Sequence, residues 1–176
     1  WVMKAACECQ YIDKVYVSTD SDIIEETVKK IKMEESVFAK VCIISRSKES
    51  ASDTASTECA MLEFAESYDF DTIVLIQATS PLLESEDLNR GFELFHEEQT
   101  DSVVSVVRQK RFNWKKDREG IVHPTNYNIY QRPRRQEFEG YLVENGAFYI
   151  SSKASLIESQ NRISGRIRAL EMSEDT

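Results

Sequence analysis

Several patterns that mark particular classes of protein are missing from this sequence. No window approaches the roughly 18 uninterrupted apolar residues of a membrane-spanning helix, and the first ten residues show no basic segment followed by an apolar run. We therefore expect neither a membrane span nor a signal peptide. A chain of 176 residues with 41% hydrophobic residues is long enough to bury one core, and no internal repeat divides it, so we expect a single domain.

An excess of positive charge is also missing. The formal net charge is -9, which argues against nucleic acid as a partner, because a nucleic-acid surface needs clustered Lys and Arg to displace counterions. A small anionic substrate is compatible with this charge, since basic side chains gather locally at Arg132, Arg134 and Arg135.

The cysteine spacing of a zinc site is missing as well. Cys7, Cys9, Cys42 and Cys59 do not form the spaced ligand pairs of such a site. We expect reduced thiols in a cytosolic or nuclear protein.

What the sequence does contain is an alternation of apolar strand patterns with amphipathic helix patterns. Strands are predicted at residues 14–18, 41–45, 72–77, 102–107 and 146–151. Helices are predicted at residues 1–10, from Asp20 or Asp22 to 32, and at 53–68, 84–99 and 153–159. Continuous apolar strands between helices indicate a parallel sheet covered on both faces. The sequence therefore predicts an α/β fold with a doubly wound, mostly parallel sheet.

The alternation stops between Arg108 and Gly146. This stretch is rich in basic and aromatic residues, contains Pro124 and Pro133, and is too long for a structureless loop in a compact domain. We expect it either to pack on a partner subunit or to form a lid over a substrate.

Polar clusters follow three of the predicted strands, at the edge of a doubly wound sheet where ligands bind. They are Ser18-Thr19-Asp20, Arg46 with the run from Ser52 to Thr57, and Gln77 to Pro81. The first is typical of an ordinary helix cap. The second has more hydroxyl and carboxylate groups than one cap requires, so a base or ribose could be held there.

Gln77 would end a buried apolar strand, where an amide without a partner costs about 1 to 3 kcal/mol. It could bind sugar hydroxyls or a base edge, or alternatively the backbone of the neighbouring loop. The arginines at 132, 134 and 135 also have two interpretations. They form either a solvated charge run or an ordered segment that binds a carboxylate or phosphate. We assign neither His96 nor His123 to catalysis, because neither has companion ligands in view.

Five motifs in register resemble the N-acylneuraminate cytidylyltransferases over essentially the whole chain, and the arginine-rich motif resembles the animal members. The motifs are Val17-Ser18-Thr19-Asp20, Arg46 with Ser52-Asp53-Thr54-Ala55-Ser56, Gln77-Ala78-Thr79-Ser80-Pro81, Arg132-Pro133-Arg134-Arg135-Gln136 and Asn145-Gly146-Ala147-Phe148-Tyr149. The resemblance implies the nucleotide-diphospho-sugar transferase type of fold. It also implies a magnesium-dependent reaction of CTP with sialic acid that gives CMP-sialic acid and pyrophosphate.

The resemblance assigns roles to single residues. Arg46 and Thr57 match positions that hold the nucleotide, and Gln77 matches a glutamine that contacts substrate. Arg134 matches the arginine considered essential near the sugar carboxylate, with Arg135 as the alternative if the register differs by one. Tyr149 matches an aromatic residue of the sugar pocket.

The resemblance further implies that residues 1–176 are a single partial domain. The family begins with a strand and a phosphate-cradling loop that would precede Trp1, and its paired magnesium-binding aspartates would follow Thr176. We therefore expect no metal site within this chain, Mg²⁺ ligands outside it, and no measurable synthetase activity from the chain alone.

The family's members are dimers that exchange an arm, so residues 108–146 are expected to be a dimerisation and substrate arm in a homodimer or larger assembly. The compartment is nuclear or cytoplasmic, with the nucleus favoured by the short basic run from Arg132 to Arg135. Three alternatives stay open. They are a cytidylyltransferase for 3-deoxy-octulosonic acid, a shortened inactive isoform and an α/β interaction module.

Overall fold

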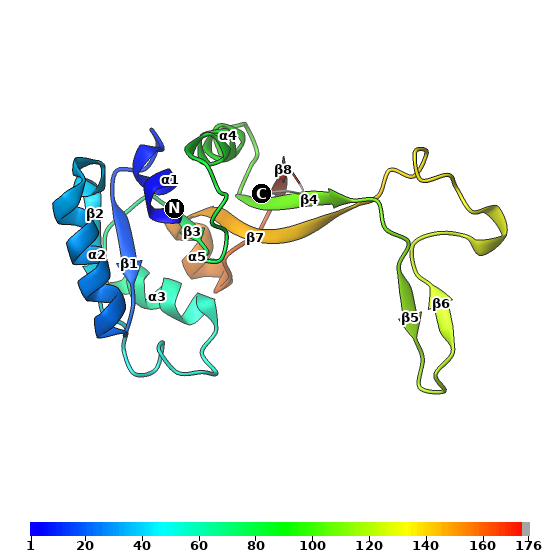
Figure 1. The fold of residues 1–176 in the computed structure, drawn as a ribbon, viewed down its shortest axis with the longest axis horizontal. Coiled ribbons are helices and arrows are strands. Elements are labelled where there is room, and N and C mark those ends of the chain that lie inside the picture. Colours follow the sequence, from blue (N-terminus) through cyan, green and yellow to red (C-terminus); the bar gives the residue numbers. More distant parts are fainter. Residues whose placement is uncertain (174–176) are drawn as a thin grey trace.

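A computed structural model describes residues 1–173 of the chain. These residues fold into an α/β layer from which an arm projects (Figure 1). The helices are α1 (Val2–Glu8), α2 (Asp22–Glu34), η1 (Ser36–Lys40), α3 (Thr57–Ser67), α4 (Ser85–Phe95), η2 (Ile129–Gln131) and α5 (Lys153–Ser159). The strands are β1 (Val15–Ser18), β2 (Val41–Ile44), β3 (Thr72–Ile76), β4 (Ser102–Gln109), β5 (Trp114–Lys116), β6 (Val122–Pro124), β7 (Tyr141–Ser152) and β8 (Ile167–Met172).

The strands form three sheets. β1 and β2 pair in parallel, and β5 and β6 form an antiparallel hairpin. The largest sheet has the order β3-β7-β4-β8, in which β7 runs antiparallel to β3 and β4 while β8 runs parallel to β4. The predicted α/β layer with a mostly parallel sheet is confirmed, and β7 is the strand that runs against the others.

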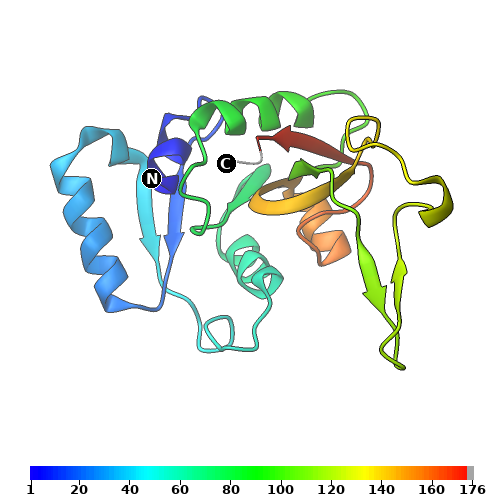
Figure 2. The ribbon, with the colours of Figure 1, turned by 45° about the vertical axis from the view of Figure 1, so that its right-hand side comes forward.

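Helices cover both faces of the four-stranded sheet (Figure 2). Successive side chains of a strand point to opposite faces, so Phe148 and Tyr149 of β7 enter different parts of the core. Phe148 packs with Leu88 and Phe92 of α4 in the largest hydrophobic cluster. The side chains of α3 and α5 form a separate cluster against β3, on the face that Tyr149 shares.

Helix α1 supplies side chains to two cores. Ala5, Ala6 and Cys9 belong to the cluster of the four-stranded sheet. Cys7 instead packs with Val28 of α2 in the cluster over β1 and β2. The helix therefore joins the two-stranded sheet to the larger one.

Strands β1 and β3 each have one edge without a strand partner in the described part of the chain, because each stands at the end of its sheet. In both views β1 is the strand of the smaller sheet on the side of the larger one (Figures 1 and 2). Both strands are half-buried along their length. Two open edges with apolar side chains thus stand at the boundary between the sheets.

The stretch from 108 to 146 is more regular than the sequence indicates. β4 and β7 stay paired as far as Gln109 opposite Tyr141, so the arm leaves the sheet as a two-stranded ribbon, and the hairpin β5–β6 follows at its far end (Figure 1). An aromatic cluster stabilises the arm. Phe112 contacts Tyr127 at 4.5 Å and Phe138 at 5.0 Å between ring centroids, and the guanidinium of Arg132 lies 4.5 Å from the Phe112 centroid.

Candidate functional site

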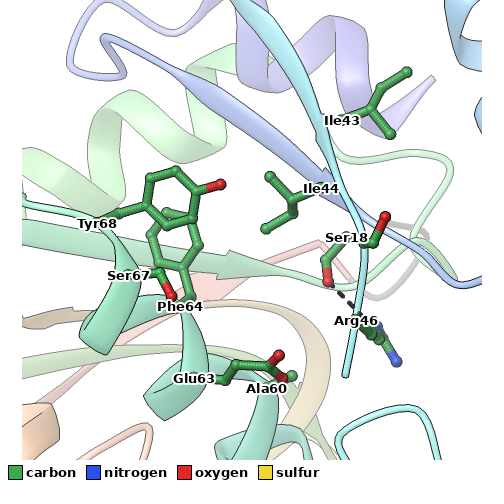
Figure 3. Close-up of a pocket in the computed structure, with 10 residues that line it drawn as sticks. Ser18, Ile43, Ile44, Arg46, Ala60, Glu63, Phe64, Ser67 and Tyr68 are labelled. Carbon is green, nitrogen blue, oxygen red and sulfur yellow. Dashed lines mark hydrogen bonds between the residues drawn. The ribbon is translucent and has the colours of Figure 1, made fainter. Parts of the chain in front are cut away.

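The first part of the candidate site is a cavity of about 300 Å³ at the carboxyl ends of β1 and β2. Arg46 follows β2, and its Nε donates a hydrogen bond of 3.2 Å to Oγ of Ser18, the last residue of β1. Phe64 of α3 and Tyr68, which follows the helix, form another wall (Figure 3), and their ring centroids are 4.5 Å apart in a stacked arrangement. Arg46 and the two aromatic rings therefore line the same cavity.

The polar run before α3 is largely occupied with its own loop. Ser56 is the N-cap of α3, and its hydroxyl accepts from the backbone N–H of Cys59 at 3.3 Å. The hydroxyl of Ser52 donates to the Glu49 carbonyl at 2.9 Å. Thr57 is the first residue of α3 and is half-buried. The helix predicted from residue 53 therefore begins at Thr57, because the preceding residues form turns.

The second part of the site lies where β3 ends against β7. The backbone N–H of Gln77 donates to the Ala147 carbonyl at 3.1 Å, and the side-chain oxygen of Gln77 lies against Gly146. Asn145 turns its own Oδ1 toward the backbone N–H of Ala147 at 3.3 Å. Two side-chain amides thus flank this corner, and both residues are half-buried.

Tyr149 lies further along β7, opposite Leu75 of β3, and is only 5% exposed. Its hydroxyl donates a 2.8 Å hydrogen bond to Oε2 of Glu144. Burial raises the pKa of the Tyr149 hydroxyl, and the neighbouring carboxylate of Glu144 raises it further, because both disfavour the phenolate. The Tyr149 hydroxyl therefore stays protonated and donates its hydrogen bond to Glu144, which is an exposed residue.

A half-buried ion pair lies on the side of α3. Arg162 Nε donates to Glu58 Oε1, and the guanidinium lies 5.1 Å from the centroid of the Tyr149 ring. The sequence analysis assigned no role to Glu58, Glu144 or Arg162. Motif residues precede Glu58 and follow Glu144, at Thr57 and at Asn145-Gly146, but Arg162 has no motif beside it and lies 104 positions from Glu58.

Arg134 and Arg135 lie in the arm, and both are exposed. The Arg134 carbonyl accepts from the backbone N–H groups of Glu137 and Phe138, both at 3.0 Å, so it begins a turn. The arm extends away from the α/β layer (Figure 1). The fold of one described chain therefore groups Gln77 with Tyr149 and Arg46 with Ser18, while the arm carries both arginines away from them.

Residues 1–173 contain neither a helix long and apolar enough to cross a membrane nor a cluster of three or more His, Cys, Asp or Glu side chains that could hold a metal ion. The four cysteines are free thiols.

Comparison with known proteins identifies the family. The model of the cytidylyltransferase family matches residues 1–162. The chain belongs to this family. Its relatives include N-acylneuraminate cytidylyltransferase A of Danio rerio, 39% identical over 162 residues, which are 90% of this chain and 36% of that protein. N-acylneuraminate cytidylyltransferase of Oncorhynchus mykiss is 36% identical over 160 residues, which are 89% of this chain and 35% of that protein. These relatives confirm the resemblance that the five motifs indicate.

A solved cytidylyltransferase-like structure has the same fold. The CMP:2-keto-3-deoxy-manno-octonic acid synthetase complexed with CTP aligns with a TM-score of 0.66 at 16% identity, over 98% of this chain and 77% of that one. At this identity the match confirms the fold alone. The chain spans only about a third of the length of the two fish relatives.

Proposed function

We propose that the protein containing this chain transfers a cytidylyl group from CTP to sialic acid. The observation that carries the proposal is that the Gln77 amide, at the end of the half-buried strand β3, lies against Gly146 of β7, two residues after the exposed carboxylate residue Glu144, in a member of the cytidylyltransferase family. Such groups bind the hydroxyls of a sugar. The names of the relatives support sialic acid as that sugar.

The cavity at the ends of β1 and β2 is our proposed nucleotide side. Its volume of about 300 Å³ is at the lower end of the range for small-molecule sites. Arg46 is exposed, and its planar guanidinium suits a phosphate. Thr57 begins α3, the helix whose residues Ala60, Glu63 and Phe64 line this cavity, and we propose that its hydroxyl also contacts the nucleotide.

In the proposed reaction the anomeric hydroxyl oxygen of the sugar attacks the α-phosphorus of CTP. A new phosphorus–oxygen bond forms, the bond from the α-phosphorus to the oxygen bridging to the β-phosphate breaks, pyrophosphate leaves, and the hydroxyl proton is released. Cationic side chains such as Arg46 stabilise the charge that develops on the phosphate oxygens. We propose that the Mg²⁺ ligands lie outside this chain, as the resemblance to the N-acylneuraminate cytidylyltransferases implies.

We propose that the arm joins two subunits in a homodimer and carries Arg134 to the sugar carboxylate of the second subunit. Large apolar side chains of the arm are exposed, among them Trp114 at 49% and Tyr130 at 89%. Exposed aromatics mixed with arginine are enriched where protein surfaces associate. An arm that points away from its own layer (Figure 1) supports delivery of Arg134 to a neighbour rather than to its own corner.

We also propose that a further strand of the whole protein pairs between β1 and β3. Each of these strands has an open edge at the boundary of the two sheets, and unpaired backbone groups at a half-buried edge are costly. A strand in this position would make one continuous sheet. It would also bring the loop that follows it to the cavity beside Arg46.

The nucleus is our proposed compartment. The basic run from Arg132 to Arg135 supports it, because Arg134 and Arg135 are exposed and exposed basic runs serve in nuclear import. Imaging a fluorescent fusion, with and without Arg134→Ala and Arg135→Ala, tests this.

The activity is tested with the full-length protein, CTP and magnesium, offering sialic acid and 3-deoxy-octulosonic acid in separate reactions. We expect pyrophosphate release and a product of the mass of CMP-sialic acid with sialic acid. The 176-residue chain alone should show no turnover. A preference for 3-deoxy-octulosonic acid, or no turnover with either sugar, contradicts the proposal.

A further inference from the structure

Four side chains from three segments form one continuous series of contacts. Glu58 of α3 binds Arg162, the guanidinium of Arg162 covers the Tyr149 ring at 5.1 Å, and the Tyr149 hydroxyl binds Glu144 at 2.8 Å. The series begins one residue after Thr57, on the proposed nucleotide side. It ends one residue before Asn145, on the proposed sugar side.

The middle of this series is shielded from water, which makes its contacts strong. The side chains of Arg162 and Glu58 are 21% and 20% exposed, and Tyr149 is 5% exposed. The hydrogen bond from Arg162 lowers the pKa of Glu58, and the bond to Glu58 raises the pKa of Arg162. Both groups are therefore held in their charged forms near neutral pH.

A β-bulge places Glu144 and Tyr149 on one face of β7. Side chains five positions apart in a regular strand point to opposite faces. Here Glu144 pairs with Val106 and Tyr149 pairs with Val104, so the strand carries extra residues between the two pairs. Within the bulge, the backbone N–H of Phe148 donates to Ser105 Oγ at 2.9 Å. The bulge thus allows the hydroxyl to reach the carboxylate.

We propose that Arg162 is a positioning residue that fixes Tyr149, and through it the Glu144 carboxylate, for binding the sugar. The inference rests on the proposed function, because it assigns Gln77 and Glu144 to the sugar. In this proposal Arg162 does not contact the sugar itself and acts through Tyr149. Its guanidinium packs against the Tyr149 ring on the side of α3 and limits the movement of the ring. The Tyr149 hydroxyl then orients the exposed Glu144 carboxylate through one hydrogen bond.

Removing Arg162 should affect one substrate more than the other. Without the guanidinium the Tyr149 ring loses its cover and Glu144 loses a fixed donor. In the full-length protein, Arg162→Ala should raise the KM for sialic acid about tenfold while the KM for CTP changes by less than about twofold. Arg162→Lys keeps a positive charge beside Glu58 and the ring but loses the planar guanidinium, so its KM for sialic acid should lie between those of wild type and Arg162→Ala.

Arg168→Ala is the matched control. Arg168 also pairs with a glutamate of another segment, Glu97, at 2.9 Å, but it makes no contact with Tyr149 among the contacts described here. Its loss should lower stability without a selective change in the KM for sialic acid. Equal changes in both KM values for Arg162→Ala, or a fall in thermal stability with neither KM changed, overturn the inference.

A second measurement does not depend on activity. The ring resonances of Tyr149 in an NMR spectrum are identified by their absence in Tyr149→Phe. They should shift in Arg162→Ala, return toward the wild-type positions in Arg162→Lys and stay unchanged in Arg168→Ala. If wild-type protein makes no CMP-sialic acid, the proposed function fails, while unshifted resonances in Arg162→Ala show separately that Arg162 does not hold the ring.

Discussion

The side-chain oxygen of Gln77 occupies the space that a methyl group on residue 146 would need. A Cβ added to Gly146 would lie 2.5 Å from Gln77 Oε1, and the backbone of Gly146 has φ +73°. Both the backbone conformation and the contact therefore require glycine at this position. The close approach fixes the Gln77 amide where β3 meets β7.

Gly146→Ala should harm both stability and sugar binding. A non-glycine residue held at this φ costs about 1 to 3 kcal/mol, and the new methyl must displace the Gln77 amide. Gly120→Ala is the control, because Gly120 has φ +88° but its added Cβ would meet only Lys116 Cε at 3.5 Å. Denaturant unfolding should show destabilisation in both variants. Only Gly146→Ala should raise the KM for sialic acid, and equal KM values in the two variants would contradict the role of Gln77.

Arg134→Ala in the full-length protein should impair turnover of sialic acid far more than it weakens CTP binding. The lost contact is a charge-assisted hydrogen bond to the sugar carboxylate, which contributes about 1.5 to 3 kcal/mol, or roughly ten- to a hundredfold. Steady-state kinetics with each substrate varied in turn measure the effect. Arg135→Ala is the companion variant. Wild-type behaviour of Arg134→Ala with an inactive Arg135→Ala would move the assignment by one residue.

Mixed subunits test whether the arm completes a neighbour's site. Arg134→Ala and Gln77→Ala subunits damage different halves of the proposed shared site. A mixture that exchanges subunits should therefore recover about a quarter of wild-type activity, because half of the random dimers contain one intact site. Each variant alone serves as the control. A folded monomer in sedimentation at micromolar concentration, with the arm present, would rule out this arrangement.

The Glu58–Arg162 pair should make stability depend on pH in the acid range. The hydrogen bond from Arg162 lowers the pKa of Glu58 in the folded state. The pair's contribution to the free energy of unfolding is therefore fully present above the ordinary glutamate pKa, and it is lost as pH falls through the lower pKa of the folded state. Glu58→Gln should lower the free energy of unfolding by about 1.5 kcal/mol at pH 7, and the difference should shrink below about pH 4.

Thermal and urea unfolding between pH 7 and 3 measure this difference. Glu171→Gln is the comparison, because Glu171 pairs with Arg108 at 2.7 Å in a more exposed place, where solvent screens the charges. Its effect should be smaller at every pH. A larger effect at residue 171 than at residue 58 would show that shielding does not strengthen the Arg162 pair.

Local patterns in the sequence predicted most of the fold. The helix over 153–159 has the predicted bounds, and every predicted strand lies within two residues of an observed one except the last, because β7 begins at Tyr141 rather than Gly146. Strand β8 was not predicted. Only Leu170 and Met172 of its residues are buried, so its sequence carries little apolar pattern. The pairing of β7 against its neighbours depends on contacts distant in sequence, which no local pattern shows.

The candidate site was predictable only where a polar residue follows an apolar strand. Arg46 and Gln77 satisfy that rule, and the structure locates both at strand ends. Arg162 lies in the loop after Ser159, together with Ser164 and a single glycine, Gly165, and gives no such signal. Its partners come from α3 and β7, and only the folded chain brings these segments together.

The double role of α1 affects how the molecule unfolds. Among the described residues no ladder of backbone hydrogen bonds joins β1 to β3, so packing around α1 provides much of the coupling between the two sheets. Segments coupled mainly by packing can open separately. Amide protons of β1 and β2 should therefore exchange with solvent at a lower opening free energy than those of the buried strand β4. A strand inserted between β1 and β3 would merge the two transitions into one.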